Sequence, residues 1–115
     1  MSTEQAVGLF LKEFKEKMVF WDVIFRDDRG KNTQTLTELE ITPIGRKKVL
    51  EVLQVKDYSQ GPLVETLYKG TDMWVFGKRI KNKEVYIKIT IGAPSSNVIC
   101  ISFHLAEYKM LYPLK

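Results

Sequence analysis

The C-terminal half of the chain contains three strand-like segments separated by short turns. They span Met73–Ile80, Glu84–Ile91 and Asn97–His104, and the last two alternate cleanly in side-chain type. The first turn, residues 81–83, contains an asparagine, which tolerates a left-handed backbone. The second, residues 92–96, is rich in glycine, proline and serine. Because strands joined by such short turns pair antiparallel, the sequence predicts a three-stranded meander.

The N-terminal half carries helical patterns. Apolar residues recur every three or four positions from Val7 to Met18, which is typical of an amphipathic helix, and Ser2 or Thr3 can cap its first turn. Residues 33–40 have the spacing of a short helix, and Thr42-Pro43 is typical of a helix start. This last helix should bury an apolar side formed by Ile44, Val49, Leu50 and Leu53. It should expose the basic run Arg46-Lys47-Lys48 to solvent.

The remaining segments complete an α+β domain. We expect a strand at 19–26, a turn at 27–32, a loop at 57–62, and a helical turn or irregular chain at 63–69. Trp21 and Trp74 are expected in the core or at its edge. The prediction is a single domain over residues 1–115, with N-terminal helices packed on one face of a C-terminal antiparallel meander.

Composition excludes several classes of site. With 115 residues the chain is long enough for one core, and its single cysteine, Cys100, allows neither an intrachain disulfide nor a cysteine zinc site. We expect Cys100 to be packed and inert, in a protein of the reducing cytoplasm. One histidine and scattered glycines predict no metal and no nucleotide cofactor. The longest apolar run, Val98–Phe103, is broken by Ser102 and is too short to cross a membrane.

The positive charge is concentrated in one stretch. The net charge is +4, while residues 1–57 carry ten basic and ten acidic side chains. Residues 69–88 carry six basic side chains and two acidic ones, an excess of four that accounts for the whole net charge. This concentration favours a polyanionic partner at the first predicted hairpin.

One face of the predicted sheet gathers polar side chains. Alternation places Tyr86 and Lys88 opposite Val85, Ile87 and Ile89. In the last strand it places Cys100, Ser102 and His104 opposite Ile99, Ile101 and Phe103. If the aliphatic side packs under the helices, Tyr86, Lys88, Ser102 and His104 share the other face. Either Lys78 or Arg79 joins them, depending on the register of the hairpin.

This face has two interpretations. Cations bind phosphates, an aromatic ring can stack on a base, and histidine can transfer protons, so the face is typical of an RNA site. Antiparallel sheets also commonly solvate one face with such residues. A nuclease, a non-catalytic nucleic-acid-binding module and a protein-interaction domain therefore all remain open.

Three strand runs and the helix exit before them carry a family resemblance. The runs are Met73-Trp74-Val75, Glu84-Val85-Tyr86-Ile87-Lys88-Ile89-Thr90 and Ile99-Cys100-Ile101-Ser102-Phe103, and the helix exit is Leu53 … Asp57-Tyr58. They resemble the MqsR family of toxins, which has a tryptophan-bearing strand, a Val-Tyr-Leu-Lys-Ile-Thr strand, and an aliphatic strand ending in Ser-Phe-Lys. The resemblance covers about residues 49–104.

The resemblance implies residue roles one position at a time. Tyr86 and Lys88 stand where the family has a functional tyrosine and lysine. His104 replaces a second functional lysine, and Gln60 lies near the position of a third. The tail 105–115 has no counterpart that aligns.

The resemblance also implies a RelE-like fold and a ribosome-independent, mRNA-cleaving endoribonuclease of a type II toxin–antitoxin system. Its partners would be messenger RNA and a cognate antitoxin similar to MqsA, with no cofactor. The expected catalytic residues are Tyr86, His104 and Lys88, and the expected RNA-binding residues are Lys78, Arg79, Gln60, Lys81 and Lys83. The expected chemistry is attack of a ribose 2′-hydroxyl on the adjacent phosphate, without a metal ion.

Overall fold

The chain forms helices first and most of its sheet afterwards. The computed structural model describes residues 1–27, 30–64 and 71–115. The elements are α1 (Thr3–Trp21), β1 (Val23–Phe25), α2 (Gly30–Leu39), α3 (Gly45–Glu51), the 3-10 helix η1 (Val55–Asp57), β2 (Tyr58–Leu63), β3 (Met73–Ile80), β4 (Lys83–Thr90) and β5 (Val98–Leu105). The predicted α+β class is confirmed. Most of the predicted 63–69 segment, Lys69 of the basic stretch, and residues 28–29 of the predicted turn lie outside the described residues.

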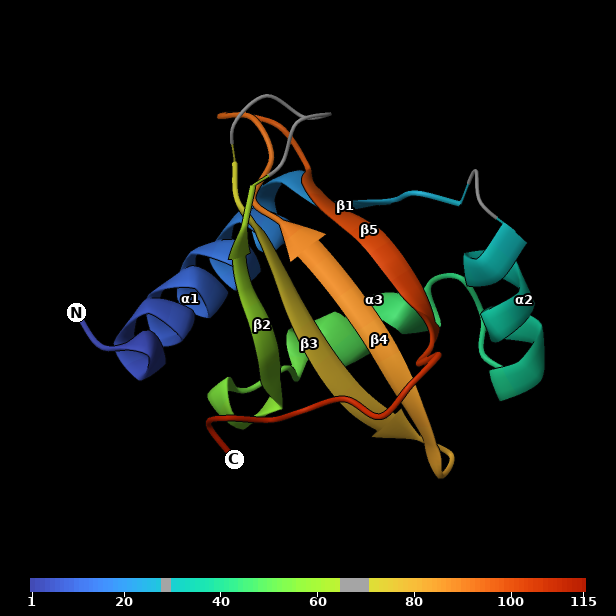
Figure 1. The fold of residues 1–115 in the computed structure, drawn as a ribbon. Coiled ribbons are helices and arrows are strands. Elements are labelled where there is room, and N and C mark those ends of the chain that lie inside the picture. Colours follow the sequence, from blue (N-terminus) through green and yellow to red (C-terminus); the bar gives the residue numbers. More distant parts are fainter. Residues whose placement is uncertain (28–29, 65–70) are drawn as a thin grey trace.

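The five strands form one sheet in the order β1-β5-β4-β3-β2 (Figure 1). Strands β3, β4 and β5 are antiparallel neighbours, as the turns predicted, and β2 pairs antiparallel with β3. Lys81 and Asn82 both have positive φ, which is the backbone of a tight hairpin turn. Strand β1 pairs parallel with β5, so the sheet is mixed and the prediction of a purely antiparallel sheet is wrong.

Helix α1 covers one face of the sheet. The Ser2 hydroxyl accepts a hydrogen bond from the backbone N–H of Gln5, which caps the helix as predicted. The Phe10 ring stacks on Trp74 with ring centroids 5.0 Å apart. Figure 1 shows α1 and α3 behind the sheet and α2 beside β5. We call the opposite face of the sheet, which is toward the viewer in Figure 1, the front face.

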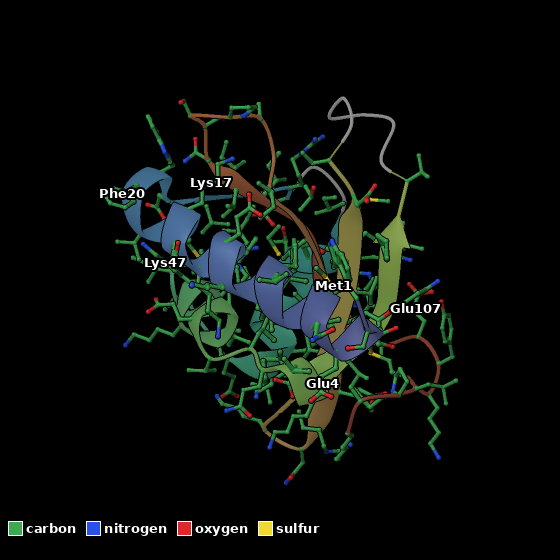
Figure 2. The ribbon with its side chains drawn as sticks, turned by 90° about the vertical axis from the view of Figure 1, so that its left-hand side faces the viewer. Met1, Glu4, Lys17, Phe20, Lys47 and Glu107 are labelled. Carbon is green, nitrogen blue, oxygen red and sulfur yellow. The ribbon has the colours of Figure 1, made fainter. Side chains whose placement is uncertain are left out.

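The chain between α1 and α2 differs from its prediction. Helix α1 continues to Trp21, so the predicted strand 19–26 shrinks to β1, and residues 31 and 32 belong to α2. Asp22, at φ 63°, ends the helix. Because the last turn of α1 projects past the core, Phe20 is 84% exposed and Trp21 is 47% exposed, whereas Trp74 is buried as expected. Figure 2 shows Phe20 at the outer end of the helix.

Helix α3 begins one turn later than predicted. The Thr42 hydroxyl accepts from the N–H of Gly45, but the helix starts only at Gly45, and Ile44 is exposed. Arg46, expected in solvent, is only 2% exposed. Its guanidinium makes two hydrogen bonds to the Asp27 carboxylate, at 2.7 and 3.0 Å, and lies 3.9 Å from the Phe25 ring centroid. This bidentate pairing offsets the cost of burying the charge.

Replacing Arg46 with methionine should lower the free energy of unfolding by about 2 kcal/mol, because it removes charge-assisted bonds of that size. Lys48→Met is the matched control, since Lys48 is exposed on the same helix, and it should change stability by less than about 0.5 kcal/mol. Urea unfolding measures both. Equal effects of the two substitutions would contradict the structural role of Arg46.

The segment after α3 is more regular than predicted. Residues 57–62 were expected to be a loop, but they end η1 and form most of β2. Tyr58 is buried against Trp74 and Phe76, and its hydroxyl donates to the Gly61 carbonyl. Tyr58 thus anchors β2 at the edge of the sheet, where β2 pairs with β3.

Strand β5 contains a bulge. Lys88 pairs with Ser102 and the next residue, Ile89, pairs with Cys100, so Ile101 is skipped in the register. As a result Cys100 joins Phe103 in the core, and the predicted grouping of Ile99 and Ile101 with Phe103 is wrong. The expected burial of Cys100 is confirmed.

Burial raises the pKa of the Cys100 thiol well above its ordinary value. In the unfolded chain the thiol loses its proton at about pH 8.5. The stabilisation that comes from burying the neutral thiol is therefore complete below about pH 8.5 and is lost as the pH rises. Cys100→Ala should therefore lose less stability than the wild type between about pH 8 and about pH 10. Denaturant unfolding at each pH measures this difference, and parallel losses would show that the thiol titrates alike in both states.

Candidate functional site

Tyr86 and His104 form the centre of the front face. They are direct cross-strand partners on β4 and β5, and their rings stack with centroids 5.1 Å apart and planes 12° from parallel. His104 Nδ1 lies 2.9 Å from the Leu105 carbonyl oxygen. A carbonyl can only accept, so Nδ1 is the donor, and in the neutral imidazole Nε2 then keeps its lone pair. The contact fixes the orientation of the ring beside Tyr86.

Lys88 occupies the adjoining row of the face. It pairs with Ser102 on β5, and its Nζ lies 5.9 Å from the Tyr86 ring centroid. Burial, and then repulsion from Tyr108, raises the pKa of Tyr86. Tyr86 therefore stays protonated at neutral pH and can donate a hydrogen bond beside the lysine's positive charge.

These residues border a small hollow. Its volume is about 160 Å³, and its lining consists of Tyr86, Lys88, Ser102, His104, Glu107 and Tyr108. That volume is below the roughly 300–1,000 Å³ of typical ligand sites. The hollow therefore suits one reacting group better than a whole nucleotide. The four strand residues were predicted to lie together, and the structure does bring them together.

Sequence reasoning missed the two residues from the tail, which in the structure is the segment 106–115 because Leu105 belongs to β5. Glu107 pairs with Lys31 of α2, and this hydrogen bond lowers the pKa of the Glu107 carboxyl. Figure 2 shows Glu107 on the side of the molecule away from Phe20. Tail residues have no strand or helix periodicity, so only their mixture of tyrosines and charges could have drawn attention to them.

The hairpin register decides between Lys78 and Arg79. Gly77 pairs with Tyr86, so Arg79, two residues further on, shares the face of Tyr86, and Lys78 has the opposite parity. Arg79 donates to the Asn82 carbonyl at 2.9 Å. Lys78 instead forms a 3.0 Å ion pair with Asp57.

The other predicted RNA-binding residues are dispersed. Gln60 pairs with Val75, which pairs with Lys88, so Gln60 lies in the cross-strand row of the lysine. Lys83 borders the tail near Tyr108. Lys81 donates to the Glu40 carbonyl at the end of α2 and lies outside the hollow.

The tail crosses the front face and covers one part of it. Figure 1 shows it passing in front of β4 and β3 toward the lower end of β2. The Tyr112 hydroxyl donates to Glu84 at 2.7 Å, and the Met110 N–H donates to the other oxygen of the same carboxylate. A Cβ at Gly77 would lie 2.2 Å from the Tyr112 hydroxyl oxygen, so the ring needs a glycine beneath it. This contact fixes the tail over the row of Tyr86.

Gly77→Ala should detach the tail, because the added methyl group cannot coexist with the seated Tyr112 ring. Hydrogen exchange should become faster at the Met110 amide and stay slow in β4. Gly8→Ala is the control, since its Cβ would meet only Val55 at 3.9 Å. Unchanged protection at Met110 in the Gly77 variant would contradict the seated tail.

No group of three or more His, Cys, Asp or Glu within the described ranges is arranged to hold a metal ion. Among the helices of those same ranges, none has the length and apolar character required to cross a membrane. No family model, curated protein or solved structure compared with the chain matches it significantly. The resemblance to the MqsR family therefore stays a prediction from the sequence.

Proposed function

We propose that this chain is a metal-independent endoribonuclease that cuts single-stranded messenger RNA. The observation that carries the proposal is the stacked Tyr86–His104 pair beside Lys88, all three at the edge of a small hollow. When a ribose 2′-hydroxyl attacks the adjacent phosphate, a base takes the hydroxyl proton. A neutral hydrogen-bond donor and a cation stabilise the negative charge of the transition state. The resemblance of the strands to MqsR toxins supports the same reaction.

The proposed reaction begins when His104 Nε2 takes the proton of a ribose 2′-hydroxyl. The 2′-oxygen then forms a bond to the adjacent phosphorus, and the bond from phosphorus to the 5′-oxygen breaks. The Lys88 ammonium supplies the proton to the leaving 5′-oxygen and stabilises the charge on the phosphoryl oxygens. The products are a 2′,3′-cyclic phosphate and a free 5′-hydroxyl.

Tyr86 has two roles in this scheme, one on the substrate and one on His104. Its hydroxyl stays protonated and can donate a hydrogen bond to a phosphoryl oxygen, while its ring fixes the His104 ring by stacking. Such a donor commonly contributes about 3 kcal/mol to transition-state stabilisation. The cations of the front face would bind the flanking phosphates.

The proposal includes a biological setting similar to that of MqsR toxins. The fold would be RelE-like, the enzyme would act in the cytoplasm without the ribosome, and a cognate antitoxin would silence it. Steady expression of the chain alone would then stop the growth of its host.

The direct test is cleavage of synthetic RNA by the purified protein in the presence of EDTA. We expect His104→Gln to lower the rate by about 10²-fold or more, because it removes the base. Lys88→Met should have an effect of similar size. Lys48→Met is the matched control, with the same change at an exposed site on α3, and it should retain the full rate.

Three outcomes would contradict the proposed reaction. They are an inert wild type, undiminished cleavage by the folded His104 variant, and cleavage of an oligonucleotide without 2′-hydroxyls. RNA binding with steep salt dependence and no products would instead identify a non-catalytic binding module.

A further inference from the structure

A groove separate from the hollow lies between the tail and the end of the first hairpin. Its volume is about 460 Å³. Its walls come from three distant parts of the chain: η1, the ends of β3 and β4, and the tail. It carries five cationic side chains and two acidic ones; the cations are Lys56, Lys78, Arg79, Lys109 and Lys115.

The two acidic side chains of the groove, Asp57 and Glu84, already accept hydrogen bonds from other residues of the protein. Asp57 Oδ2 accepts from Lys78 Nζ and from the Gln54 N–H. Glu84 accepts from Tyr112 and Met110 of the tail, one bond to each carboxylate oxygen. Asp57 therefore neutralises Lys78. Among the described residues that line the groove, Glu84 is then the one acid beside the other four cations.

We propose that this groove binds phosphate groups of the RNA strand on one side of the cleavage point. The inference rests on the proposed function and adds a substrate subsite to it. A groove with an excess of positive charge attracts a chain of phosphates, and lysine and arginine side chains bind them without reading sequence. The Tyr112 ring forms part of the wall and adds an aromatic surface.

The groove and the hollow are connected along the tail. A depression between them shares Glu107 and Tyr108 with the hollow, and Glu84 and Lys109 with the groove. A strand with its reacting phosphate beside His104 can therefore follow the tail and place flanking phosphates near Lys109 and Lys56. The tail would then form one wall of the path along which the RNA strand binds.

The test uses two double variants of equal charge. Lys56→Gln/Lys109→Gln removes two cations from the groove, and Lys12→Gln/Lys48→Gln removes two exposed cations from α1 and α3. The probe is a fluorescent oligo-deoxyuridylate, which lacks the 2′-hydroxyl and so reports binding without cleavage. Affinity is measured over a range of salt concentrations.

We expect the slope of log affinity against log salt to fall by about 1.4 in the groove variant, from two phosphate contacts of about 0.7 each. The control variant should keep the wild-type slope. Lys56→Arg/Lys109→Arg should restore binding, because it preserves both charges. Identical slopes in the groove and control variants, or no binding of the probe by the wild type, would overturn the inference.

Two further measurements separate this inference from the proposed function. If the wild type cleaves RNA but the groove variant binds like the control, the subsite is wrong and the nuclease stands. If the groove variant alone loses binding and the wild type cleaves nothing, the nuclease is wrong and the phosphate site stands. Displacement of the probe by inorganic phosphate at an equal phosphate concentration would overturn the assignment to a polymer.

Discussion

The bulge at Ile101 decides on which face of the sheet the first residues of β5 lie. A regular strand would put Cys100 on the same face as Ser102 and His104. The skipped residue lets Cys100 pack with Ile89, while Phe103 still packs beside Ile87 and His104 still faces Tyr86. The core depends on this irregularity, because it lets Val98 and Cys100 before the bulge and Phe103 after it lie on the same face of the sheet.

The outer edge of β5 is divided between a strand and a helix. Residues 98–100 pair with β1, whereas the N–H groups of Phe103 and Leu105 donate to side chains of α2, Asn32 and Thr35. These bonds satisfy backbone groups that an edge strand would otherwise present to other chains. They also place α2 where Lys31 reaches Glu107, so the edge of the sheet helps to position the tail.

The tail divides the front face into two chemically different parts. On one side lies a hollow lined by His104, Tyr86 and Lys88, and on the other lies a larger groove dominated by cations. A nuclease must react at one phosphate and must also bind the neighbouring phosphates of the same strand. The contact of Tyr112 with Gly77 holds the tail between these two parts of the face.

The sequence by itself determined the three-stranded meander, the first helix with its cap, and the grouping of Tyr86, Lys88, Ser102 and His104. These features depend on local periodicity and short turns, which neighbouring residues specify. Only the tertiary structure decided the parallel pairing of β1, the burial of Arg46, the bulge and the path of the tail. Each of these joins residues far apart in the chain, and no local pattern encodes which distant partner satisfies a charge or a strand edge.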